Sequence, residues 1–354
     1  MVLAMVTNEH GEDHSVDQSP YEYERLQGNN EGFHYVRLIS LLPAPHRELP
    51  LRCEIRHAEL SLAVSGKSTK SESQTPDYEV LSYVWGDASP FDRIFFHQGA
   101  LDIGNNLSIA LRRLREGRIS RTLWIDAICI NQEDVDERNA QVTLMHNIYS
   151  QAKQVIIFLG EPNPPPKHWD IKAAFHLTKK LATFGRTLPD LDLRKVGLTR
   201  RKFQTLRLGF PCINSGKYAA LRVFFTRPWF GRMWVVQEAA CARWAIIVRG
   251  DHQMAFAEFM KGTEYGLTSG LFLPAHIRKM ILPIQSEAPR GNLSSAIAMY
   301  RLASLEPQDQ GSRLPLLTST LAVENEVPIS LLKLLRRFHG SRATNCLRFW
   351  AWLP

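Results

Sequence analysis

One apolar stretch, Leu123 to Gln132, constrains the fold of this chain more than any other. Half of its residues are aliphatic, three of them β-branched isoleucines, and Trp124 adds an indole, which is the composition of a buried strand. Asp126 interrupts the run, and a carboxylate on a buried strand is costly unless it is paired or lies at the strand's exposed carboxyl end. The stretch therefore predicts a central strand with its carboxylate in one of those two environments.

A helix and a second apolar strand follow this stretch. Asn131 ends the run and can cap the helix, with Asp134 three residues later in the manner of a capping box. Apolar residues at helical spacing then extend from about residue 135 to 152, and residues 155–160 form the next apolar run. Strand, helix and strand in this order form a βαβ unit, which favours an α/β fold with a mostly parallel sheet covered on both faces.

Around this unit the sequence predicts further strands and helices. Apolar patterns predict strands at 33–42, 51–62, 78–87, 93–96, 100–103 and 245–248, with a hairpin turn at Gln98-Gly99. Helical spacing predicts helices at 107–114, capped by Asn105 or Asn106, and at 169–184, 228–240, 256–280, 293–305 and 329–338.

Composition divides the 354 residues into three parts. Residues 1–30 are acidic and poor in aliphatic residues, so they are predicted to be a disordered tail. Residues 31–250 hold the predicted sheet, with a basic insertion at about 186–218. Residues 251–354 are predicted to be a helical C-terminal region.

The net charge of +8 is concentrated between residues 171 and 250, where sixteen Lys and Arg residues face three acidic ones. Such a region can bind nucleic acid or another anion, or it can be a solvated helical surface. No zinc-finger, basic-zipper or RRM-type signature accompanies the charge, so nucleic-acid binding is not expected.

The cysteines and the hydropathy pattern indicate a reducing compartment. The five cysteines are scattered and contain no C-x-x-C pair, which argues for free thiols rather than disulfides or a zinc site. No apolar run is long enough to span a membrane, and the N-terminus lacks the features of a signal peptide. We expect a cytoplasmic protein with no membrane segment.

The common catalytic and ligand-binding signatures are absent. No G-x-G-x-x-G, Walker, H-E-x-x-H or G-x-S-x-G motif occurs. Four histidines, His57, His97, His146 and His176, are isolated in the sequence, and we expect surface or packing roles for them. No metal site is predicted.

Three dense blocks instead combine tryptophan, glycine and a carboxylate near predicted strand ends or helix starts. Ligands of open α/β sheets bind outside the carboxyl ends of the strands, where Asp87 and Asp126 are expected to lie. We expect Trp85 and Trp124 to pack in the core rather than bind a ligand.

The third block places Trp234 and Glu238 four residues apart, on one face of a predicted helix. An indole can shelter a carboxylate and raise its pKa, which suits general acid/base work or stabilisation of a positive transition state. The alternative is a Glu238 paired with Arg232 or another nearby arginine.

The three blocks, in this order, closely resemble the fungal heterokaryon incompatibility (HET) domain family. The residues that carry the resemblance are Tyr78, Leu81, Ser82, Tyr83, Trp85, Gly86 and Asp87; Trp124, Ile125, Asp126, Cys129, Ile130, Asn131, Gln132, Glu137, Arg138, Gln141, Val142, Met145, Ile148, Tyr149, Ala152, Leu159 and Gly160; and Arg227, Trp229, Arg232, Trp234, Gln237 and Glu238.

The resemblance implies an intracellular fungal protein of non-self recognition and programmed cell death. Such a protein would act as a signalling module that self-associates or binds a protein partner. Family members often continue into a helical region with an Ala-Thr-Asp-Pro-Arg-Asp-like segment. This chain begins like it at Arg342 to Asn345 and then departs, so we expect a truncated C-terminal region or a misread gene end.

The HET family is in turn similar to TIR domains, which implies a flavodoxin-like, doubly wound sheet flanked by helices, here with extra N-terminal strands. In TIR enzymes a Glu four residues after a Trp cleaves NAD at the nicotinamide glycosidic bond. Carried over, Glu238 would be catalytic and Trp234 would wall the pocket, with NAD as a substrate and no resident cofactor. Trp85, Asp87, Asp126 and Arg232 would contribute to ligand binding, the two aspartates to ribose and the arginine to a phosphate.

Overall fold

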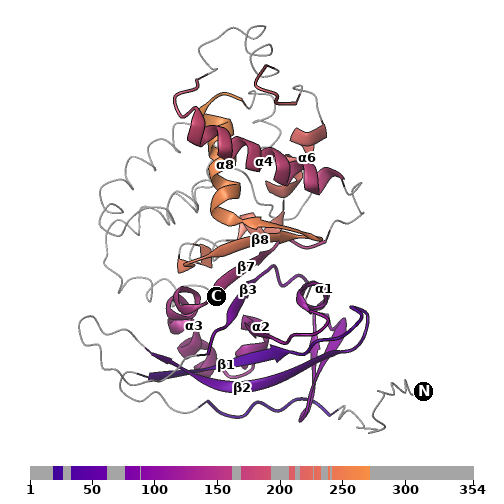
Figure 1. Ribbon diagram of the computed structural model, residues 1–354. Coiled ribbons are helices and arrows are strands. Elements are labelled where there is room, and N and C mark those ends of the chain that lie inside the picture. The colour runs from indigo at the N-terminus through magenta and orange to yellow at the C-terminus, as the bar shows by residue number, and fades with distance from the viewer. Residues whose placement is uncertain are drawn as a thin grey trace.

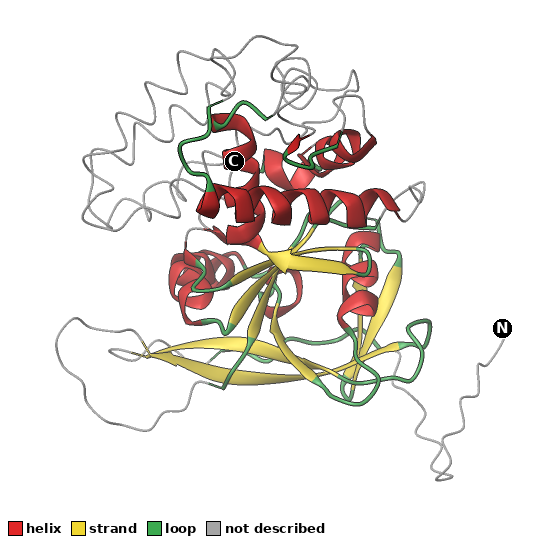
Figure 2. Ribbon diagram, turned by 45° about the horizontal axis from the view of Figure 1, so that its top comes forward, coloured by secondary structure: helices red, strands yellow, loops and turns green. Residues whose placement is uncertain are grey.

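The computed structural model describes residues 19–26, 33–61, 76–87, 89–161, 169–192, 207–211, 216–225, 227–232, 238–239 and 241–271. These residues form a mixed α/β fold around a nine-stranded sheet with the strand order β5-β4-β2-β1-β6-β3-β7-β8-β9 (Figures 1 and 2). The strands are β1 (Phe33–Leu41), β2 (Leu51–Ser61), β3 (Glu79–Ser82), β4 (Asp92–Phe96), β5 (Gly99–Ile103), β6 (Arg121–Trp124), β7 (Gln154–Phe158), β8 (Ala245–Arg249) and β9 (His252–Ala255). The helices are α1 (Asn105–Leu114), α2 (Asp126–Cys129), α3 (Val135–Gln151), α4 (Trp169–Thr187), α6 (Gly216–Phe225), the 3₁₀ helix η2 (Pro228–Gly231) and α8 (Phe256–Thr268).

The centre of the sheet is parallel. Strands β6, β3, β7 and β8 lie side by side, with Val80 opposite Trp124 on one side and Val155 on the other. If these four strands are numbered by their order in the chain, their order across the sheet is 2-1-3-4. Continuous apolar runs form these strands because both faces are covered, as the buried Val155 to Phe158 illustrate.

Antiparallel strands extend the core at both ends. Strand β1 pairs antiparallel with β6 and β2, and β9 pairs antiparallel with β8 at the far edge. The antiparallel β4–β5 hairpin joins beyond β2 through a short parallel pairing of β4 with β2. Helices α1 and α3 lie on opposite sides of the central strands, whereas α4, α6 and α8 gather above the β8 and β9 end (Figures 1 and 2).

The backbones of α4 and α8 approach unusually closely. A β-carbon added at Gly262 of α8 would lie 2.1 Å from the carbonyl oxygen of Thr178 of α4. Only glycine fits this crossing, which lets α4 and α8 pack closely against each other.

The predicted βαβ unit is confirmed, but the strand that opens it is shorter than predicted. Strand β6 ends at Trp124, and residues 126–129 turn into the short helix α2. Ile128 and Cys129 remain fully buried in this helix. A short apolar run cannot distinguish a buried strand from a buried helix, which explains the error.

Both predicted helix caps are wrong. Asp134, not Asn131, caps α3 by accepting a 3.0 Å hydrogen bond from the backbone N–H of Glu137. Helix α1 begins after Gly104 with no side-chain cap, and Asn106 instead donates to the carbonyl oxygen of Val84 at 3.0 Å. The predicted packing of Trp124 in the core is confirmed, whereas Trp85 is 43% exposed.

The described fold also crosses two of the predicted domain boundaries. Residues 19–26 belong to the predicted disordered tail, yet Tyr21 is buried and its backbone N–H donates to the carbonyl oxygen of Ala100 at 2.9 Å. Strand β9 and helix α8 continue the fold past residue 250 to Leu271. The predictions for residues 1–18, 293–305, 329–338 and 342–345 and for most of 186–218 lie outside the described residues. Among the described helices, none is both long and apolar enough to cross a membrane.

Candidate functional site at the carboxyl edge of the sheet

Polar residues from distant parts of the chain meet at the carboxyl ends of the central strands. Ser82 ends β3, Asp126 follows β6 by one residue, Arg232 follows η2, and Glu238 lies on a helical segment before β8. The chain leaves β3 toward β6 on one side and leaves β7 toward β8 on the other. The carboxyl edge between β3 and β7 is therefore the topological switch point, where open α/β sheets bind ligands.

Glu238 is buried, with 5% of its surface exposed, and hydroxyl groups surround it. The hydroxyl of Ser82 donates a short hydrogen bond to Oε2 of Glu238, and the Ser82 oxygen accepts one from the indole Nε1 of Trp229 at 2.7 Å. The phenol of Tyr149, on α3, also hydrogen-bonds the Glu238 carboxylate. This arrangement fixes both the position and the orientation of the carboxylate.

The environment raises the pKa of Glu238. Burial is the largest cause, and the nearby Asp126 carboxylate adds to it, while Arg232 and the hydrogen bonds from Ser82 and Tyr149 act in the opposite direction. None of the ion pairs among the described residues joins Glu238 to an arginine. The predicted alternative of a Glu238–Arg232 salt bridge is therefore not what the geometry shows.

Asp126 is the second carboxylate of the cluster and is half-buried. Its Oδ2 accepts a 2.9 Å hydrogen bond from the indole Nε1 of Trp85, and its Oδ1 accepts one from the backbone N–H of Ala127 at 2.8 Å. Burial raises the pKa of Asp126, and the hydrogen bond from Trp85 and the charge of Arg232 oppose that rise. Both environments foreseen for this carboxylate apply, because it is paired and also lies at a strand's carboxyl end.

Arg232 is the cation of the cluster. Its guanidinium donates to the carbonyl oxygen of Tyr83 and acts electrostatically on both Asp126 and Glu238. We refer to Ser82, Asp126, Tyr149, Trp229, Arg232 and Glu238 as the switch-point cluster. Two carboxylates with raised pKa values beside one arginine can exchange a proton with a ligand, or can stabilise positive charge that develops on it.

One of the predicted site residues, Asp87, does not join this cluster in the structure. Asp87 lies on the exposed loop after β3, and no described hydrogen bond links its side chain to Asp126 or Glu238. Trp234 lies outside the described residues. The structure brings Trp85, Asp126, Arg232 and Glu238 together.

Ser82, Trp229 and Tyr149 were not predicted as site residues, although they hold Glu238 in place. Ser82 and Glu238 are 156 residues apart, and Trp229 is 147 residues from Ser82. No local spacing connects such positions. Their presence within the three dense blocks was the one available signal.

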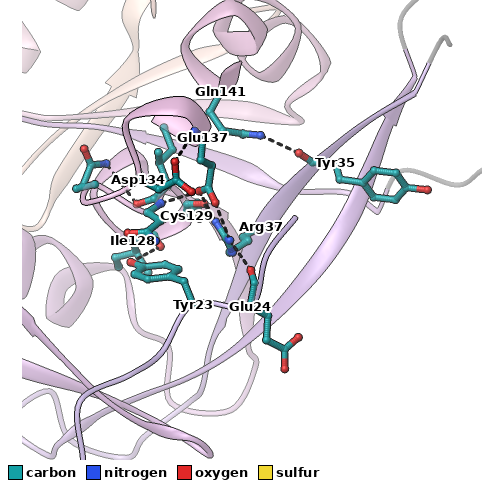
Figure 3. A network of polar contacts seen from close by, with 12 residues as sticks. Tyr23, Glu24, Tyr35, Arg37, Ile128, Cys129, Asp134, Glu137 and Gln141 are labelled. Atoms are coloured by element: carbon teal, nitrogen blue, oxygen red, sulfur yellow. Dashed lines mark hydrogen bonds and ion pairs between the residues drawn. The ribbon is translucent and has the colours of Figure 1, made fainter. Parts of the chain in front are cut away.

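A second polar network, drawn in Figure 3, has a structural role. The guanidinium of Arg37, on β1, is fully buried and pairs with Glu137 of α3 at 2.5 and 3.0 Å. It also donates to the carbonyl oxygens of Cys129 and Glu24 and lies over the ring of Tyr23. This network joins β1, the α2–α3 connection and the segment 19–26. Within the ranges that the structure describes, no group of three or more His, Cys, Asp or Glu residues could hold a metal ion.

The fold and the switch-point cluster define an α/β domain with a candidate ligand site at the carboxyl edge of its sheet. Residues 78–238 match the family model described as heterokaryon incompatibility protein (HET), so this part of the chain is similar to the HET family, as the three sequence blocks indicated. A Neurospora crassa protein named heterokaryon incompatibility protein 6, OR allele, is 35% identical over 153 residues, which are 40% of this chain. The matched part is 21% of that relative, so the chain spans about a fifth of its length. No solved structure matches the chain.

Proposed function

We propose that this chain is a signalling protein of heterokaryon incompatibility in a filamentous fungus, acting in the cytoplasm in non-self recognition and programmed cell death. Its HET domain would self-associate or bind a protein partner when a non-self signal is present. The family match carries this proposal, and the matched range 78–238 includes every member of the switch-point cluster. The name of the similar Neurospora protein supports the same biological process.

Expression of the full chain in a filamentous fungus tests this role. We expect growth arrest or cell death when the wild type is induced, and a loss of that effect in Glu238→Gln. Asp102→Asn is the matched control, because it removes one carboxylate from an exposed surface pair. Equal killing by wild type and Glu238→Gln would show that the cluster is not needed for signalling. Absence of killing by folded wild type, alone and with co-expressed alleles, would contradict the role itself.

Self-association is tested separately by light scattering on the purified chain. A mass that rises with concentration supports the self-associating form of the proposal. A molecular mass that stays that of a monomer at all concentrations contradicts self-association. If no partner protein is captured from incompatible strains either, the proposed signalling by assembly is contradicted as a whole.

A second candidate function is cleavage of NAD by a TIR-like domain. The central parallel strands lie in the order β6-β3-β7-β8, which is 2-1-3-4 by their order in the chain. Flavodoxin-like sheets have this order, which supports a TIR-like fold. The buried Glu238 at the switch point supports the activity. In this mechanism the Glu238 carboxylate stabilises the ribosyl cation that forms as nicotinamide leaves. Arg232 would hold a phosphate and Trp85 and Asp126 would contact the substrate.

Incubation of the purified chain with millimolar NAD tests the enzyme hypothesis by following the release of nicotinamide. We expect Glu238→Gln to abolish release and Glu79→Gln to retain it. Glu79 is a suitable control because it lies at the opposite end of β3, where it pairs with Arg121. No release by the wild type, even when it is forced to oligomerise, would contradict this candidate.

A further inference from the structure

The thiol of Cys241 and the imidazole of His146 lie next to each other, close to the switch-point cluster. Nδ1 of His146, on α3, is 3.1 Å from Sγ of Cys241, although the two residues are 95 positions apart. His146 is exposed and Cys241 is half-buried, so the pair lies at the protein surface. The sequence presented His146 as an isolated histidine, and the fold gives it a partner.

The His146–Cys241 contact lies next to the contact between Tyr149 and Glu238. His146 and Tyr149 are three residues apart on α3, and Glu238 and Cys241 are three residues apart on the helical segment that faces it. Residues at this spacing share one side of a helix. Tyr149 with Glu238 and His146 with Cys241 therefore form two successive contacts between the same two segments.

The other described cysteines differ from Cys241 in burial. Cys53 and Cys129 are both buried, and burial raises the pKa of the Cys129 thiol to about 12 and also raises the pKa of the Cys53 thiol. Thiols in such apolar surroundings are unreactive, whereas a partly exposed thiol beside an imidazole has the geometry of an activated nucleophile.

We propose that Cys241 and His146 form a modification site for small-molecule disulfides. We propose further that modification of Cys241 weakens the hydrogen bond between Tyr149 and Glu238. The imidazole takes the proton of the Cys241 thiol, and the thiolate attacks one sulfur of a disulfide R–S–S–R. The S–S bond of the reagent breaks, its second sulfur leaves with the bonding electrons and takes the proton from the imidazolium as R–SH. Cys241 is left as the mixed disulfide Cys241–S–S–R.

The added group occupies the space between α3 and the helical segment of Glu238. Because Glu238 is one helical turn from Cys241, the contact of Glu238 with Tyr149 is the first that this separation weakens. The remaining titratable groups of the two contacts are Glu238 and Tyr149, and Arg232 acts on both of them. The modification step is independent of the proposed function, so its test does not use activity.

The test is brief treatment of the full-length protein with cystamine at pH 7, followed by peptide mapping that separates all five cysteines. We expect Cys241 to be modified at least tenfold faster than Cys53 and Cys129. Because the imidazole takes the thiol proton, it raises the thiolate fraction more than it lowers the intrinsic reactivity of the thiolate, so His146→Gln is expected to slow the reaction about threefold. His176→Gln, at an exposed histidine of α4, is the matched control and leaves the rate unchanged.

Two further results decide the proposal. At pH 10 the thiol ionises without help, so His146→Gln and wild type are expected to react at similar rates. Amide hydrogen exchange around residues 145–149 and 238–241 is expected to rise after cystamine treatment in wild type but not in Cys241→Ser. The proposal is overturned if Cys241 reacts no faster than Cys129, if His146→Gln keeps the wild-type rate at pH 7, or if exchange does not change.

Discussion

The buried ion pair between Arg37 and Glu137 allows a quantitative prediction for Glu137→Gln. This substitution keeps the size of the side chain and removes its charge. The side chain of Arg37 is 0% exposed and that of Glu137 is 10% exposed, so water cannot replace the lost carboxylate. The guanidinium would keep its bonds to the carbonyl oxygens of Cys129 and Glu24 but would lose its counter-charge.

The expected loss follows from the cost of an uncompensated buried charge. Breaking a buried pair by removing one partner costs about 3–5 kcal/mol of unfolding free energy. The lost carboxylate also accepts a 2.7 Å hydrogen bond from the backbone N–H of Asn131, which the amide oxygen of glutamine can still accept. We therefore expect a loss of about 3 kcal/mol, near the lower end of that range.

Urea denaturation followed by circular dichroism measures this loss as a lower midpoint with an unchanged slope. The matched control is Asp102→Asn, which breaks the surface pair with Arg93, where both side chains are about half exposed. That variant is expected to lose at most about 1 kcal/mol. The reasoning is refuted if Glu137→Gln loses less than the surface control.

The remaining predictions concern packing, backbone conformation and pH. Gly262→Ala is expected to lower the free energy of unfolding by about 3 kcal/mol, because its β-carbon would overlap the Thr178 carbonyl oxygen. Gly117→Ala is the control and is expected to lower it little, because the nearest atom to its β-carbon is 3.9 Å away. Thermal melting compares the two variants, and equal melting temperatures would contradict the close helix crossing. Gly86→Ala is expected to cost about 1 kcal/mol or more, because φ is +79° and Asn106 lies against the site, and a melting temperature equal to wild type would contradict this. The raised pKa of Glu238 means that the folded state binds its proton more tightly than the unfolded state, so its contribution to stability falls as pH rises from about 4.5 through the folded value. Urea midpoints should therefore show Glu238→Gln gaining on wild type with rising pH, and a constant difference would contradict the raised pKa.

Much of the fold could be predicted because its central strands are marked by local patterns. The runs that became β3, β7 and β8 are continuous and apolar, as expected for parallel strands covered on both faces. The alternation in β1 and β2 predicted strands that pair outside that core. Local patterns failed where tertiary contacts decide, as in residues 19–26, which are ordered by the burial of Tyr21 and by the bond from Arg37 to Glu24.

The candidate site was predictable only in part. Asp126 could be located because a carboxylate that interrupts an apolar run must lie at an edge or be paired. The exposure of Trp85 could not be predicted from the sequence, because its indole N–H donates a hydrogen bond to the Asp126 carboxylate, 41 residues away. The pairing of His146 with Cys241 was missed for the same reason.

A double-mutant cycle between Ser82 and Glu238 tests most directly whether the distant blocks of the chain meet at one site. Unfolding free energies would be measured for wild type, Ser82→Ala, Glu238→Gln and the double variant at one pH. The short hydrogen bond between the two side chains predicts a coupling energy of about 0.5–3 kcal/mol. Strict additivity of the two substitutions, within about 0.3 kcal/mol, would contradict the switch-point cluster.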